Sequence, residues 1–213
     1  MAEVSASILT VEKDNATQMF YDLEVAKINY FHIDVMDGKF VEKDTTSVMK
    51  DYALTISHIS NLGLDVHLMV DNPEKYIPLY AALNAEYIVF HVEVESDIMK
   101  CLKMIKQYSI KAGLSIKPDT NISELVPFLP YVDMILVMSV EPGKGGQSFI
   151  EGSGDRITEV RELLNSYNIP AVINVDGGIN AETRKYCGDA DIVTAGSYII
   201  GSRDFQEKIS SLR

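Results

Sequence analysis

The chain has 213 residues, of which 46% are hydrophobic and 23% are charged, a composition typical of a soluble globular protein and a length suited to one domain. Its net charge of −12 argues against nucleic acid and anionic membrane surfaces as partners. Only Cys101 and Cys187 are present, and the first residues, MAEVSASILTVEKD, form no basic and apolar leader. We therefore expect a reduced, cytoplasmic protein with no disulfide framework.

Short apolar or β-branched segments alternate along the chain with segments of helical periodicity. The predicted strands are residues 4–9, 30–36, 64–70, 86–92, 110–116, 132–138, 169–175 and 190–196. The predicted helices are residues 12–27, 73–83, 98–108, 155–167 and 181–187, with Asn72 and Asn180 as possible N-caps. No linker or low-complexity segment interrupts this alternation.

Eight strands that alternate with helices predict a parallel sheet, and this number in one domain predicts a closed (β/α)8 TIM barrel that spans residues 1–213. The alternative is an open doubly wound sheet. Such sheets usually carry G-x-G-x-x-G after the first strand, and this fingerprint is absent.

A barrel places functional groups at the carboxyl ends of its strands, on one rim. Polar residues follow or end each of the predicted strands. They are Ser7, His32 with Asp34, His67, His91 with Glu93, Lys117, Ser139, Asp176 and Ser197. This pattern is the main evidence in the sequence for an active site.

Four of these residues have side chains that bind divalent transition metals: His32, Asp34, His67 and Asp176. His32 and Asp34 face the same way because side chains alternate along a strand. Each histidine alone is better explained as a satisfied rim residue, whereas the four together favour a site for zinc, iron(II), manganese or cobalt. His91 and Glu93 are candidates to support the ligands rather than to bind the metal, and His58 lies in a helical stretch.

Glycines gather in three loops that directly follow predicted strands. They are Gly143, Gly145 and Gly146 in SVEPGKGGQSF, Gly177 and Gly178 in VDGGIN, and Gly196 before Ser197 in TAGS. Backbone amides in such loops can wrap an anion, and barrels often bind phosphate after their seventh and eighth strands. Three methionines at strand ends, Met36, Met69 and Met138, are ordinary core residues or an apolar wall over a small ligand.

A metal, two carboxylates and a phosphate site suit proton abstraction beside a carbonyl, in which the metal stabilises an enediolate. The same residues would also suit hydrolysis by a metal-bound hydroxide. Residue types alone do not separate these two reactions.

The chain resembles the ribulose-phosphate 3-epimerases over essentially its whole length. The matching segments are SASIL, FHIDVMDGKFV, DVHLMV, FHVE, KAGLSIKPDT, MILVMSVEPGKGGQSFI, NVDGGIN and AGSYI. The resemblance implies that His32, Asp34, His67 and Asp176 bind one divalent metal ion, and that Asp34 and Asp176 are the two catalytic acid/base residues. It further implies a homo-oligomer that acts in the pentose phosphate pathway.

The resemblance also assigns substrate contacts to Ser7 and His67. Asp176 is a further substrate contact, and the phosphate-binding segments are Gly143, Lys144, Gly145 and Gly146, then Gly177 and Gly178, and finally Gly196 with Ser197.

The sequence departs from the family pattern at four positions around the rim. Glu42 and Lys43 replace the usual Pro-Asn, Lys144 replaces an aromatic residue, and Lys117 stands where asparagine is common. These departures leave the sugar open, with D-ribulose 5-phosphate ranked before D-allulose 6-phosphate. A metal-dependent phosphoester hydrolase and a non-catalytic sugar-phosphate sensor are more distant alternatives.

Overall fold

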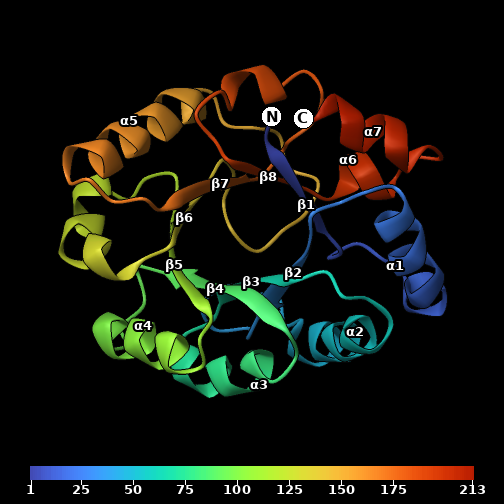
Figure 1. Cartoon of the computed structure of the whole chain (residues 1–213), viewed down its shortest axis with the longest axis horizontal. Helices are drawn as coiled ribbons and strands as arrows, with labels where there is room; N and C mark the ends of the chain where they lie inside the picture. The colour runs from blue at the N-terminus through green and yellow to red at the C-terminus, as the bar shows by residue number, and fades with distance from the viewer.

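A computed structural model describes all residues 1–213, and eight parallel strands form a closed barrel in it (Figure 1). The strands pair in chain order, and β8 closes the ring by pairing with β1. Their bounds are β1 Glu3–Ser7, β2 Tyr30–Met36, β3 Leu64–Met69, β4 Ala85–His91, β5 Lys111–Ile116, β6 Met134–Met138, β7 Val172–Asp176 and β8 Ile192–Ala195. The predicted TIM barrel is confirmed, and every strand overlaps a predicted one.

The helices form a ring around the barrel in Figure 1. The α-helices are α1 Ala16–Val25, α2 Thr46–Ile59, α3 Ile77–Ala81, α4 Ile98–Gln107, α5 Ser153–Ser166, α6 Ser197–Ile200 and α7 Phe205–Ser211. Short 3-10 helices are η1 Lys13–Asn15, η2 Pro73–Lys75, η3 Ile122–Tyr131 and η4 Arg184–Tyr186. None of these helices has the length and hydropathy that a membrane-spanning helix requires.

The predicted helix over residues 181–187 is wrong. Only the three-residue η4 forms there. The side-chain oxygen of Asn180 accepts the backbone amides of Glu182 and Thr183, at 2.8 and 3.1 Å, as an N-cap does. The turns that follow do not continue as an α-helix, because the amides of Tyr186 and Cys187 bond to carbonyls three residues back. The predicted helix over residues 73–83 is likewise divided into η2 and α3, the latter with Pro78 in its first turn.

The barrel separates two groups of buried side chains. The larger apolar cluster, of 54 buried residues, lies between the strands and the helices and includes Phe31, Ile33 and Val35 of β2. The interior of the barrel contains a smaller apolar cluster of eight residues, with Tyr30, Tyr87 and others near the amino ends of the strands. Because side chains alternate along each strand, the remaining inward positions point toward the barrel axis, and many of them are polar.

Candidate active site

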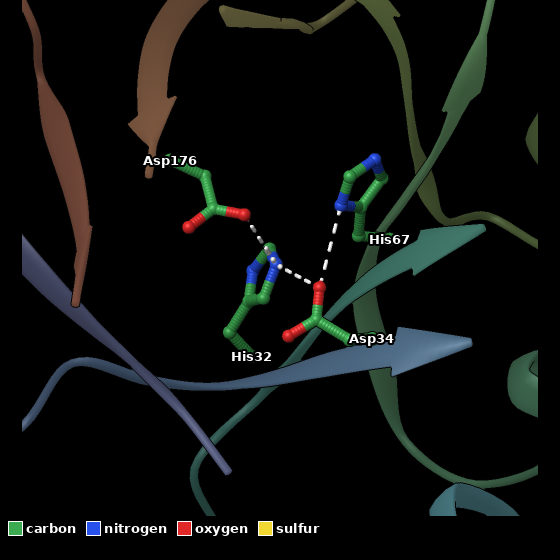
Figure 2. Close-up of side chains that lie close together, drawn as sticks. All are labelled: His32, Asp34, His67 and Asp176. Atoms are coloured by element: carbon green, nitrogen blue, oxygen red, sulfur yellow. Dashed lines mark ion pairs between the residues drawn. The ribbon is translucent and has the colours of Figure 1, made fainter. Parts of the chain in front are cut away.

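The four predicted metal ligands meet at the carboxyl ends of β2, β3 and β7. His32, Asp34, His67 and Asp176 each offer one nitrogen or oxygen atom, and these atoms all lie within 4.8 Å of one another. Figure 2 shows the two aspartates and His67 arranged around the ring of His32. The sequence therefore identified a set of residues that the fold does bring together.

The contacts within the cluster centre on Asp34 and His32. Oδ1 of Asp34 lies 3.3 Å from Nε2 of His32 and 3.5 Å from Nδ1 of His67 (Figure 2). Asp176 approaches from the other side of the ring, with its Oδ2 atom 3.7 Å from the same Nε2 atom. Two nitrogens and two carboxylates thus face one small volume.

Two buried atoms of this cluster have no hydrogen-bond partner: Nε2 of His32 and Nδ1 of His67. Unpartnered buried nitrogens are costly, and both of these point at the carboxylates of the cluster. Histidine nitrogen and carboxylate oxygen are the donors that divalent transition metals take in proteins. The residues present therefore fit a metal ion, which would pair both nitrogens and neutralise both carboxylates.

Asp65 contacts the ring of His32 on the side away from the cluster, and this residue was not predicted from the sequence. Oδ2 of Asp65 lies 2.7 Å from Nδ1 of His32 and also accepts hydrogen bonds from Ser5 and Asn174, at 2.9 and 3.0 Å. Since a carboxylate only accepts, the hydrogen of a neutral His32 lies on Nδ1 and leaves Nε2 bare. Asp65 thereby orients His32 toward the cluster.

His67 is supported by His91, the last residue of β4, and by Glu93, which follows that strand. Nε2 of His67 lies 2.9 Å from Nε2 of His91, whose Nδ1 atom lies 3.0 Å from Oε2 of Glu93. Oε1 of Glu93 accepts the backbone amide of Lys117, at 2.8 Å, and the hydroxyl of Thr120. A continuous chain of hydrogen bonds therefore runs from the cluster to the loop after β5.

Burial and mutual charge separate the pKa values of the two aspartates. Burial would raise the pKa of Asp34, but the charge of His32 and the close approach of His67 outweigh it and lower that pKa. Burial raises the pKa of Asp176 to about 7, and the charges of Asp34 and Asp65 add to this effect. At neutral pH one carboxyl is thus ionised while the other titrates.

The pKa values of His32 and His67 also shift in opposite directions. Burial opposes the charged form of His32, yet Asp34 and Asp65 raise its pKa well above the usual value. Burial dominates at His67 and lowers its pKa. A cation bound in the cluster would displace the proton of His32.

A pocket opens above the cluster and contains most of the predicted substrate-contacting residues. Ser7 donates a hydrogen bond of 2.7 Å to Oδ2 of Asp34. The pocket is also lined by Met36, Met69, Met138, Asp176, Thr194 and the glycine loops at residues 143–146, 177–178 and 196–197. The three methionines therefore face the pocket, and each is almost wholly buried.

The loop after β6 lies over the barrel opening, where Figure 1 draws it in gold. A hydrogen bond of 2.9 Å from the amide of Ile150 to the carbonyl of Ser139 joins the two ends of the loop. The loop packs so closely on the turn after β7 that a Cβ atom on Gly178, whose φ is +64°, would lie 2.3 Å from the nitrogen of Phe149. Only glycine fits this contact without a shift of the backbone.

Comparison with known proteins agrees with this geometry. The family model described as "Ribulose-phosphate 3 epimerase family" matches residues 3–200. The chain belongs to this family. The ribulose-phosphate 3-epimerase of Bacillus subtilis is 33% identical over 216 residues, which cover 100% of this chain and 99% of that protein. The enzyme of the same name from Aquifex aeolicus is 38% identical over 187 residues, covering 85% and 82% of the two chains.

The family match and these relatives show that the chain is an epimerase of this family. Solved structures add support for the fold alone, because their sequences are distant. A structure of KGPDC from Streptococcus mutans has a TM-score of 0.75 at 10% identity and covers 99% of this chain and 95% of its own. 3-Hexulose-6-phosphate synthase from Salmonella typhimurium has a TM-score of 0.64 at 16% identity, with 99% and 96% covered.

Proposed function

We propose that the chain is a metal-dependent 3-epimerase that interconverts D-ribulose 5-phosphate and D-xylulose 5-phosphate. The observation that carries the proposal is the approach of two carboxylates, Asp34 and Asp176, from different strands to one pocket. Epimerisation needs one group that removes a proton from one face of a carbon and another that returns a proton to the opposite face. The family and its relatives, all named for ribulose phosphate, support this choice of substrate.

The phosphate of the sugar is placed in the glycine loops after β7 and β8, whose residues 177–178 and 196–197 line the pocket. Backbone amides of such loops bind anions. The third carbon then lies near the aspartates, with Met36, Met69 and Met138 excluding water around it. Ser7 orients the carboxylate of Asp34 through its hydrogen bond.

In the forward direction one aspartate takes the proton from the third carbon, and an enediolate forms. The other aspartate delivers a proton to the opposite face. In the metal-free protein the pKa of Asp176 is raised to about 7 and that of Asp34 is lowered, so Asp34 is the more readily ionised of the two carboxyl groups. We therefore assign Asp34 as the base and Asp176 as the acid for one direction, with reversed roles for the other.

A divalent metal held by His32, Asp34, His67 and Asp176 would stabilise the negative charge that develops on the substrate oxygens. Zinc, iron(II), manganese and cobalt all match the two-nitrogen, two-oxygen donor set. We also propose a homo-oligomer of the pentose phosphate pathway in the reduced cytoplasm, a setting supported by two buried, unpaired cysteines, Cys101 and Cys187.

The test incubates the metal-loaded protein with D-ribulose 5-phosphate or D-allulose 6-phosphate in D2O. We expect D-xylulose 5-phosphate with deuterium at the third carbon, detected by NMR. Faster turnover of D-allulose 6-phosphate would identify that sugar as the substrate instead. Release of inorganic phosphate without deuterium exchange would show that the protein is a hydrolase and not an epimerase. The double variant Asp34→Asn/Asp176→Asn serves as the control for contaminating epimerase.

A further inference from the structure

A second cavity adjoins the active-site pocket, and three lysines line it. It has a volume of about 540 Å³ and lies among the loops after β2, β5 and β6, which contribute Lys43, Lys117 and Lys144. Residues 141–144 border both this cavity and the active-site pocket. The two spaces are therefore separated only by one short piece of the loop after β6.

The lysines of this cavity are not paired with carboxylates. Ion pairs within 4 Å occupy other lysines of the chain, such as Lys100 with Glu74 and Lys111 with Glu86, but none involves these three. The cavity is also bordered by Glu42 and Glu141, so its side chains carry one net positive charge. In a chain of net charge −12, such a surplus beside the active site is a local exception.

Lys117 is held in place at the edge of the cavity. Its Nζ atom lies 4.3 Å from the centre of the Phe40 ring, and that ring also packs on His91, with ring centres 4.7 Å apart. The backbone of Lys117 is fixed as well, because its amide bonds Glu93 and its carbonyl accepts a hydrogen bond of 3.0 Å from Arg156. An aromatic face positions an ammonium group without neutralising it, so the charge stays available to a ligand.

The cavity adjoins the glycine loop after β6, and its other lysines lie across the barrel mouth from the glycine loops after β7 and β8. Lys43 and Lys117 follow β2 and β5, the strands on either side of β3 and β4, and β3 and β4 lie opposite β7 and β8 in the closed ring. On the proposed function, a sugar whose phosphate occupies the glycine loops extends its far end past the aspartates toward the lysines.

We propose that the lysine cavity binds a second anionic group, a phosphate or a carboxylate, while the glycine loops hold the first phosphate. The class of ligand is a ketose phosphate with an anionic group at its other end, or a ketose monophosphate together with a separate small anion. Both kinds of ligand assume the position of the sugar that the proposed function gives. The shared requirement is an oxyanion within reach of Lys43, Lys117 and Lys144.

The experiment measures binding to the metal-loaded protein by calorimetry. The probes are D-ribulose 5-phosphate, D-ribulose 1,5-bisphosphate and inorganic phosphate. We expect the bisphosphate to bind about tenfold more tightly than the monophosphate, the effect of one charge-assisted contact. The double variant Lys43→Asn/Lys117→Asn should remove this preference and change the monophosphate affinity by less than about twofold.

The matched control is Lys103→Asn, which removes another exposed lysine that lies over an aromatic ring, 6.0 Å from the centre of Tyr131. This lysine is on the outer helix α4, so the preference for the bisphosphate should persist.

Two results support the proposal and distinguish its forms. A lysine-dependent preference for the bisphosphate shows that both anionic groups belong to one ligand. A saturable binding of inorganic phosphate in the presence of the monophosphate, lost in the double variant, shows a separate anion.

Absence of both effects in the wild-type protein, or their persistence in the double variant, overturns the proposal. Turnover of D-ribulose 5-phosphate is measured on the same samples. A protein that shows the lysine-dependent effect without epimerising this sugar contradicts the proposed function and leaves the second anion site standing.

Discussion

The Nε2 atoms of His67 and His91 lie 2.9 Å apart, so one ring must donate to the other. Nδ1 of His91 faces the carboxylate of Glu93, which only accepts, and this nitrogen therefore carries the hydrogen. Burial lowers the pKa of His91 to about 4 and also lowers that of His67, so both rings are neutral at pH 7. It follows that Nε2 of His67 donates and that its Nδ1 atom presents a lone pair to the cluster.

Replacing Glu93 by glutamine should reverse the direction of the hydrogen bond between His67 and His91. The amide oxygen would keep the bonds to Lys117 and Thr120, which leaves the NH2 group facing His91. His91 would then donate to His67, and Nδ1 of His67 would carry a hydrogen where the metal needs a lone pair. We expect the metal affinity to fall by roughly 10–100-fold, the usual effect of losing a partner that orients a ligand. Competition with a chromophoric chelator measures it.

Thr120→Val is the matched control for Glu93→Gln. It removes one donor to Glu93 but leaves the carboxylate and its bond to His91 in place. Metal affinity should stay close to that of the wild-type protein. Equal losses in both variants would mean that Glu93 acts through the loop after β5 rather than through the histidine rings.

Removal of the metal should abolish turnover. If the cluster holds one ion, the purified protein contains about one divalent metal per chain. Dialysis against a strong chelator should leave a folded, inactive protein, and zinc, iron(II), manganese or cobalt should restore the activity. Elemental analysis together with assay of the treated protein checks this, and full activity without any metal would refute the assignment.

Metal affinity should also fall as the pH decreases. In the metal-free protein the pKa of Asp176 is raised to about 7, so below pH 7 a proton occupies a group that the metal requires as a carboxylate. One such proton costs roughly 50-fold in affinity between pH 7 and pH 5, and the proton on His32 adds to the loss. Titrations corrected for the pH dependence of the chelator test the slope; a flat profile would show that Asp176 is not a ligand.

Asparagine in place of either aspartate removes a proton carrier with little change of shape. We expect Asp34→Asn and Asp176→Asn each to reduce turnover by roughly 10²–10⁴-fold, and more where metal binding suffers as well. A steady-state assay with measured metal content separates the two effects.

Exchange gives a sharper distinction between the two aspartates. A variant that keeps the base for one face should still wash deuterium from the labelled third carbon into solvent while forming no epimer. Near wild-type rates in both metal-loaded variants would rule out a two-base mechanism.

Lys144 is an exposed residue that borders both the active-site pocket and the lysine cavity. Replacing it with phenylalanine should raise KM by about fivefold with little change in kcat, because an exposed charge adds modest, uniform binding of an anionic substrate. The effect should shrink at high salt, and kinetics at two ionic strengths measure it. The same KM for both proteins at either salt concentration would show that this lysine faces solvent.

The barrel and the cluster of four candidate metal ligands could be predicted because both depend on local patterns. Alternation of strands and helices fixed the fold class, and polar residues at strand ends pointed to the cluster. Asp65 was missed because it lies one layer deeper, two residues before His67 in the same strand. Its signal was nevertheless present: Ser5 and Ser7, and Asn174 and Asp176, show the same two-residue spacing on inward-facing positions of β1 and β7.

The lysine cavity could not be predicted from local patterns. Lys43, Lys117 and Lys144 are far apart in the sequence and come from three loops, whose conformations depend on tertiary contacts. One of these is the bond from Arg156 of α5 to the carbonyl of Lys117. The helix predicted at residues 181–187 is wrong although Asn180 accepts amides as an N-cap does, because the next turns form bonds of the 3-10 type instead of an α-helix.

The hydrogen bond between Ser139 and Ile150 has a consequence for how this enzyme can diverge. It joins the two ends of the loop after β6, so residues 140–149 form a loop whose ends lie next to each other on the barrel. Substitutions within that loop, such as Lys144, can alter what the mouth recognises while β6 and α5 keep their places. Selection can therefore change the residues at the barrel mouth without moving His32, Asp34, His67 and Asp176, except at the contact between Phe149 and Gly178.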